Sequence, residues 1–90
     1  MALYWVNYDL NKNDKDYKTV IDYLKSHQSW AKPLKSSFLV KTTLTAAQLR
    51  DGIKANIDAN DSVLVITVTG QSWASVRVPK DVTDWMKEQL

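Results

Sequence analysis

The chain has few residues whose type and position could do chemistry, and Asp9 is the clearest of them. It ends a run that starts at Leu3 and is rich in aromatic and β-branched residues, which is typical of a β-strand. After Leu10, the polar residues 11–14 are typical of a turn and a helix cap. A carboxylate where a core strand meets a loop is held rigidly and can still face solvent. Asp9 is therefore a candidate catalytic acid and a candidate ligand for Mg²⁺ or Mn²⁺, since hard divalent cations prefer oxygen ligands.

A purely structural role for Asp9 is the alternative, in which its side chain forms an Asx turn before the first helix. The nearby Asn11 and Asp14 are best interpreted as loop and cap residues. One acid per chain can still hold a divalent cation if phosphate oxygens or a second copy of the chain complete the ligand set. Both roles for Asp9 stay open at this point.

Several basic and aromatic side chains could contact nucleic acid. The candidate phosphate contacts are Lys12, Lys32, Lys35 and Arg77. Lysine on an exposed strand edge also protects against edge-to-edge aggregation, and Arg77 could instead form a salt bridge between subunits. Trp30 and Trp73 could stack on bases, or could fill a core or an interface.

Composition excludes several classes of site. The chain of 90 residues has no cysteine, so it has no disulfide, no thiolate nucleophile and no cysteine-based zinc site. Its single histidine, His27, excludes a multi-histidine metal site within one chain, and we interpret it as a structural cation at a helix end. The formal net charge of +2 permits a nucleic-acid partner without requiring one. No apolar run is long enough to span a membrane and no signal peptide is evident, so we expect a cytoplasmic protein without a membrane partner.

The elements that must position Asp9 follow from hydrophobic periodicity. An apolar stripe predicts a helix that ends at about Ser26, and residues 29–42 are typical of two strands with a tight connection. A capping box at Thr45 and Gln48 opens a second helix. The strongest strand covers residues 62–69, a weaker fifth strand covers residues 73–78, and a short helix follows Pro79.

This order predicts a single α+β domain, residues 1–90, with a ferredoxin-like βαββαβ arrangement, an added fifth strand and a short C-terminal helix. The first and fourth strands are apolar on both sides. Two helices can cover only one face of the sheet, so something must cover the other face. A second copy of the chain is the most economical cover, and we therefore expect a homodimer.

Three short motifs carry a resemblance to a known family. They are Asn7-Tyr8-Asp9 at the end of the first strand, Ser37-Phe38 in the third strand and Asp61-Ser62-Val63 at the start of the fourth. In their order and spacing, over nearly the whole length, the chain resembles the CRISPR-associated Cas2-like superfamily. This superfamily includes virulence-associated protein D and bacterial proteins that carry the SinR family label.

The resemblance implies a ferredoxin-like homodimer whose fifth strand often joins the partner's sheet. It also implies that Asp9, with Tyr8 beside it, serves a divalent-metal-dependent nuclease activity near the two-fold axis. In CRISPR adaptation the same fold acts instead as a scaffold for duplex DNA. The chain departs from the family pattern in having lysines but no arginine near the hairpin and the first helix.

Two functions therefore remain as hypotheses. The first is a Cas2-like homodimer that binds RNA or DNA and acts as a metal-dependent endoribonuclease or endodeoxyribonuclease through paired Asp9 residues, in a CRISPR or a toxin system. The second is a non-catalytic dimer that serves as a scaffold or a regulatory interaction module.

Overall fold

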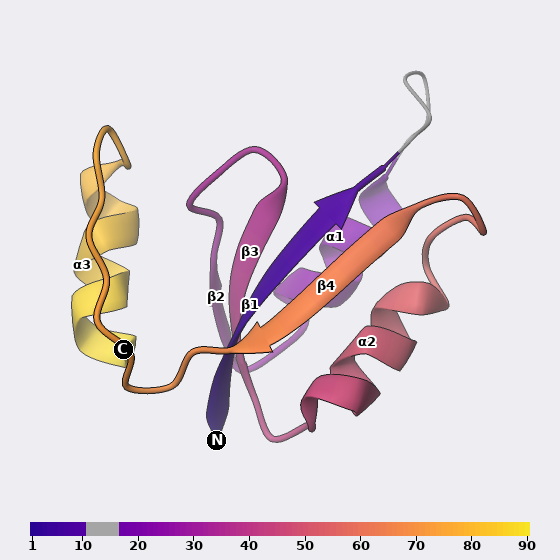
Figure 1. Ribbon diagram of the computed structural model, residues 1–90, viewed down its shortest axis with the longest axis horizontal. Coiled ribbons are helices and arrows are strands. Elements are labelled where there is room, and N and C mark those ends of the chain that lie inside the picture. The colour runs from indigo at the N-terminus through magenta and orange to yellow at the C-terminus, as the bar shows by residue number, and fades with distance from the viewer. Residues whose placement is uncertain (11–16) are drawn as a thin grey trace.

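A four-stranded antiparallel sheet forms the centre of the structure, a computed structural model that describes residues 1–10 and 17–90. The strands are β1 (Ala2–Asp9), β2 (Ser29–Ala31), β3 (Ser37–Thr42) and β4 (Ser62–Thr67), and the helices are α1 (Lys18–Lys25), α2 (Ala46–Lys54) and α3 (Lys80–Gln89). The strand order across the sheet is β2-β3-β1-β4, with every neighbouring pair antiparallel (Figure 1). This is the order of a ferredoxin-like sheet, and the predicted fold class is confirmed.

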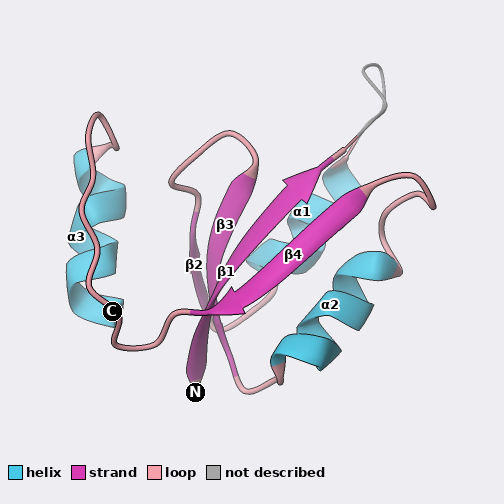
Figure 2. Cartoon of the chain, in the orientation of Figure 1, coloured by secondary structure: helices cyan, strands magenta, loops and turns pink. Residues whose placement is uncertain are grey.

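Helices α1 and α2 lie together on one face of the sheet, and α3 lies apart from them (Figure 2). Alternate residues of the strands point into the layer between the sheet and these two helices. The core there is made of buried side chains from the sheet and both helices, namely Tyr4, Val6, Val20, Leu24, Phe38, Val40, Leu49 and Ile53. The two helices contribute pairs spaced four residues apart, which is the spacing that places side chains on one helix face.

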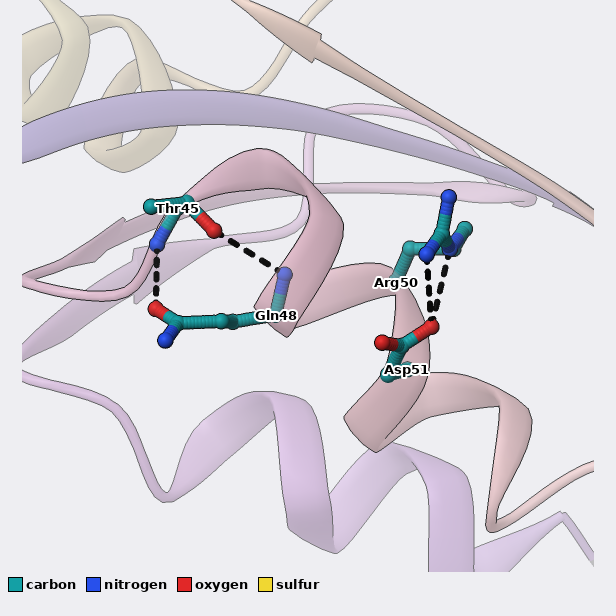
Figure 3. Close-up of polar contacts among 4 residues, drawn as sticks. All are labelled: Thr45, Gln48, Arg50 and Asp51. Atoms are coloured by element: carbon teal, nitrogen blue, oxygen red, sulfur yellow. Dashed lines mark hydrogen bonds and ion pairs between the residues drawn. The ribbon is translucent and has the colours of Figure 1, made fainter.

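Helix α2 begins with the predicted capping box. The Thr45 hydroxyl accepts a hydrogen bond from the Gln48 N–H at 3.1 Å, and the Gln48 side-chain oxygen accepts one from the Thr45 N–H at 2.9 Å (Figure 3). Two N–H groups that a helix start leaves unpaired are thereby satisfied, which stabilises the fold by about 1 kcal/mol. The neighbouring ion pair between Arg50 and Asp51 is exposed and contributes little, since water screens it.

Gly52 provides close packing between α2 and α1. A methyl group at this position would overlap the phenol ring of Tyr23, which in turn packs edge-on against His27 at 4.9 Å between ring centroids. Alanine normally stabilises a helix interior by about 1 kcal/mol relative to glycine. At this site the overlap outweighs that preference, because the rigid ring can yield only by giving up its own contacts.

We expect Gly52→Ala to destabilise the protein by about 1–3 kcal/mol, measured by urea unfolding. In a Tyr23→Ala background the same substitution should become neutral or stabilising, because the ring that it meets is gone. A stabilising effect of Gly52→Ala in the otherwise unchanged protein would contradict this packing.

The second face of the sheet is only partly covered. Leu64 of β4 stands opposite Asn7, and Ile66 opposite Trp5, so all four side chains share the face that α1 and α2 do not cover. Leu64 and Ile66 are 59% and 41% exposed, whereas Leu3 on the same face is buried. The prediction that β4 is apolar on both sides is therefore confirmed, and β4 is the part of this face that stays open.

Helix α3 and the segment before it cover the rest of that face. The Trp85 indole N–H donates to the Ser29 hydroxyl at 2.8 Å, and the Lys41 ammonium donates to the side-chain oxygen of Gln89 at 2.8 Å. These two bonds join α3 to β2 and β3. Beneath the segment lies a mostly apolar cavity of about 480 Å³ whose lining includes Trp5, Leu39, Trp73, Val76, Val78 and Met86.

The predicted fifth strand is not present as a strand in the part of the chain that the structure describes. Residues 73–78 pair with none of β1 to β4. The chain turns away from β4 at Gly70, with φ of 71°, and Arg77 has φ of 57°. A residue in this left-handed region interrupts the extended backbone that strand pairing needs. The side chains of Trp73 and Val78 line the cavity instead.

Candidate functional site

Asp9 lies at the end of β1, and its side chain is exposed. Its backbone stands opposite Ser62 of β4, and the Tyr8 N–H donates to the Ser36 carbonyl at 3.1 Å on the other side. The end of β1 is therefore held from both neighbouring strands. Because side chains alternate along a strand, Asp9 shares the partly open face with Asn7, which stands opposite Leu64.

Tyr8 anchors the same end of the sheet from the opposite face. Its ring lies 6.4 Å from the ring of Phe38, and its hydroxyl donates to the Lys35 carbonyl at 3.3 Å. Burial raises the pKa of the Tyr8 hydroxyl, because burial disfavours the charged phenolate. Tyr8 is therefore a neutral hydrogen-bond donor at neutral pH and not a base.

Two of the candidate phosphate contacts, Lys32 and Lys35, lie in the loop between β2 and β3. The Lys32 ammonium donates to the carbonyls of Leu34 and Lys35 at 2.7 and 2.6 Å, and it lies 5.6 Å from the centre of the Phe38 ring. Burial lowers the pKa of Lys32, and the Lys35 side chain is exposed. Since the loop is bonded to Tyr8, the structure brings both lysines to the same end of the sheet as Asp9.

The other two candidate phosphate contacts are less closely placed. Lys12 lies outside the described residues. Arg77 is exposed in the segment before α3, and its neighbours Val76 and Val78 line the cavity together with Pro33 and Leu34. Arg77 is thus near the loop between β2 and β3, but no described contact joins it to Asp9.

Among the residues that the structure describes, a divalent cation would find an incomplete ligand set. Among residues 1–10 and 17–90, no three acidic or histidine side chains gather in a way that could hold a metal ion. Asp61, next to the Ser62 that faces Asp9, accepts a hydrogen bond from the Asp58 N–H at 2.9 Å and so shapes a turn. The exposed carboxylate of Asp9 suits Mg²⁺ or Mn²⁺ chemically, but phosphate, water or a second Asp9 must supply further oxygens.

His27 is not the cation that its position near a helix end predicted. Burial lowers the pKa of its imidazole, and the ring packs edge-on against Tyr23. A neutral imidazole fits these surroundings, because burial disfavours the charged form. His27 therefore packs against α1 through Tyr23, and burial favours its neutral form.

One basic residue beside the candidate stacking residue Trp30 was missed from the sequence. Lys25, the last residue of α1, places its ammonium 4.9 Å from the ring of Trp30 in β2. The signal that could have found it is the charge pattern, since no acidic residue occurs between Asp22 and Asp51.

An antiparallel sheet in the order β2-β3-β1-β4, two helices on one face and an exposed acid ending β1 together define an α+β, ferredoxin-like protein. The chain belongs to the family of CRISPR associated protein Cas2, whose family model matches residues 1–76. Family membership makes this a nucleic-acid-related protein, as the resemblance predicted.

The match to the family covers all four strands and ends before α3. Neither the comparison with curated proteins nor that with solved structures found a match. None of the helices in residues 1–10 and 17–90 has the length and apolar character needed to cross a membrane.

Proposed function

We propose that the protein is a homodimer that binds nucleic acid and cleaves RNA or DNA with Mg²⁺ or Mn²⁺ held at Asp9. The observation that carries this proposal is the shared face of β4 and β1. The exposed apolar residues Leu64 and Ile66 lie on the same side of the sheet as Asp9. A second copy that covers the apolar residues therefore also brings a second Asp9 toward the first.

A two-fold axis is the simplest relation between the copies. Exposed leucine and isoleucine side chains side by side on an edge strand are costly to leave in water, and a second β4 offers the same pair of side chains. In a two-fold interface each surface meets its own counterpart. Asp9 pairs with Ser62 at one end of the β1–β4 ladder. A two-fold axis close to this end would bring the Asp9 residues of the two copies into one site.

Paired Asp9 residues supply the kind of ligands that a hard cation takes. When bound, the cation would polarise a phosphate group and activate water for attack on phosphorus. The residues of this chain would hold and orient the substrate: Asp9 fixes the position of the cation, and Lys35 offers its exposed ammonium to the phosphate backbone. Tyr8, through its bond to the Lys35 carbonyl, keeps that loop next to Asp9.

Metal removal is the direct test of this function. We expect the purified protein to cleave labelled single-stranded RNA or DNA in Mg²⁺ or Mn²⁺, and cleavage to stop when EDTA removes the metal. Light scattering should give twice the mass of the 10.3 kDa chain. Cleavage that continues in EDTA, or a monomer at micromolar concentration, would contradict the proposal.

A non-catalytic dimeric scaffold is the second candidate function. It is favoured by the incomplete ligand set among the described residues and by α3, which lies beyond the residues that match the family. A scaffold would bind nucleic acid or a protein partner without any metal-dependent hydrolysis. The same cleavage assay therefore separates the two candidates.

A further inference from the structure

An exposed tryptophan and three lysines lie along the outer edge of the sheet. Trp30 is in the middle of β2, which is one of the two edge strands of the sheet, and its side chain is 37% exposed. Lys25 lies beside it at the end of α1, and Lys32 and Lys35 follow in the next loop. We call Lys25, Trp30, Lys32 and Lys35 the β2 edge patch.

The indole of Trp30 is held in a fixed position. Its ring lies 5.9 Å from the ring of Phe38 at an interplanar angle of 54°, and Phe38 is completely buried. The Lys25 ammonium lies over the Trp30 ring, and Lys25 itself is exposed. It can therefore move to a phosphate while an aromatic base takes its place on the indole.

The local charge favours an anionic ligand. Residues 23–50 contain no aspartate or glutamate, and they contain Lys25, Lys32, Lys35, Lys41 and Arg50. The nearest acid before this stretch is Asp22 of α1, which pairs with Lys18, and no acid lies in β2, β3 or the loops that flank them. The acidic residues of α3 lie on the other face of the sheet, since α3 bonds to Ser29 and Lys41, whose side chains point away from Trp30.

The patch leads toward the end of the sheet that carries Asp9. Trp30 stands opposite Val40 of β3, and Val40 stands opposite Tyr4 of β1. Tyr4 precedes Asp9 by five residues, and a strand rises about 3.3–3.4 Å per residue, so the patch begins about 17 Å from the level of Asp9. Lys32 uses two of its three ammonium hydrogens on carbonyls of the loop, which leaves one for a ligand. Lys35 ends the patch beside Tyr8.

We propose that the β2 edge patch binds single-stranded nucleic acid, with an unpaired base stacked on Trp30 and the flanking phosphates on Lys25, Lys32 and Lys35. The nucleic-acid class of the ligand rests on the proposed function, which this inference deepens by naming the form of the substrate. A single strand is required because a duplex buries the faces of its bases, whereas an unpaired base has a free face for an indole. The bound strand runs along β2 toward the end of the sheet that carries Asp9, whose side chain lies on the other face of the sheet.

Binding is tested without cleavage, by fluorescence anisotropy of a labelled, unstructured RNA oligonucleotide in EDTA. Trp30→Leu should raise Kd by about 5- to 150-fold, since stacking on one aromatic side chain contributes about 1–3 kcal/mol per base. Trp30→Phe keeps an aromatic face and should retain most of the affinity. Trp73→Leu is the matched control, because Trp73 lines the cavity on the other face of the sheet. This variant should bind the oligonucleotide as tightly as the unchanged protein does.

Removal of one phosphate contact should appear in the salt dependence. Lys25→Gln is expected to weaken binding and to reduce the slope of log K against log salt by about 0.7, the value for one phosphate of a single strand. Circular dichroism and urea unfolding of each variant show whether it is folded before binding is measured.

Three results would overturn the inference: wild-type affinity in a folded Trp30→Leu variant, equal losses in Trp30→Leu and Trp30→Phe, or a matching duplex that binds as tightly as the single strand. Failure of this inference and failure of the proposed function look different. A protein that binds through Trp30 but cleaves nothing keeps the patch and loses the nuclease. A protein that cleaves with metal but binds equally well after Trp30→Leu keeps the nuclease function and contradicts the patch.

Discussion

Asp9→Asn is expected to lower metal-dependent cleavage by at least about 100-fold. Asparagine keeps the size of the side chain and one oxygen but removes the negative charge that holds the cation. Lewis-acid stabilisation of the transition state amounts to several kcal/mol, and each 1.36 kcal/mol is tenfold in rate. Because Asp9 is exposed, the free energy of unfolding should change by no more than about 0.5 kcal/mol.

Asp51→Asn is the matched control for this substitution. Asp51 is also exposed, and it pairs with its neighbour Arg50 on α2 (Figure 3). It should leave the cleavage rate unchanged. A folded, dimeric Asp9→Asn variant that cleaves as fast as the unchanged protein would show that Asp9 holds no catalytic metal.

Mixed dimers show whether the two copies of Asp9 act together. When unchanged and Asp9→Asn chains are mixed in equal amounts and allowed to exchange, about one quarter of the dimers keep both acids. If one site needs both carboxylates, activity is about a quarter of that of unchanged protein at the same total concentration. If each chain works alone, activity falls to about half, and paired action is excluded.

Phe38→Ala is expected to destabilise the protein by about 3–5 kcal/mol, the usual cost of deleting a buried aromatic ring. The Phe38 side chain is completely buried, and its ring packs near those of Tyr8 and Trp30 and beneath the ammonium of Lys32. Domains commonly have only about 5–15 kcal/mol of stability, so much of the total would be lost. Urea unfolding followed by circular dichroism measures the change.

Phe38→Leu separates the packing role of this ring from its role beneath the β2 edge patch. Leucine keeps most of the apolar volume, so the loss of stability should be clearly smaller than for alanine. Nucleic-acid binding should still weaken, because Trp30 loses the ring that fixes its position. An unchanged urea midpoint for Phe38→Ala would contradict the central place of this residue in the core.

The fold could be predicted from the sequence because its main signals are local. The continuous apolar runs of β1 and β4 and the capping box at Thr45 and Gln48 depend on neighbours within a few positions. These signals determine the element order, and the element order determines the sheet. The end of β1, and with it the exposed position of Asp9, followed from the same reasoning.

What could not be predicted depends on contacts between distant segments. A fifth strand needs a free sheet edge and an extended backbone. The composition of residues 73–78 does not reveal that the backbone of Arg77 adopts a left-handed conformation. The contact between Lys25 and Trp30 exists only because the end of α1 returns to β2. The pKa of His27 is lowered by burial, which a position near a helix end does not reveal.

The cover formed by α3 and the preceding segment has an optical consequence. Trp5 and Trp73 line the cavity under this cover and Trp85 bonds to Ser29, whereas Trp30 faces the opposite side of the sheet. A partner that lifts the cover would transfer three indoles into water and shift their emission to longer wavelengths. A base on Trp30 would quench a different indole, so the unlabelled protein carries separate fluorescent reporters for its two faces.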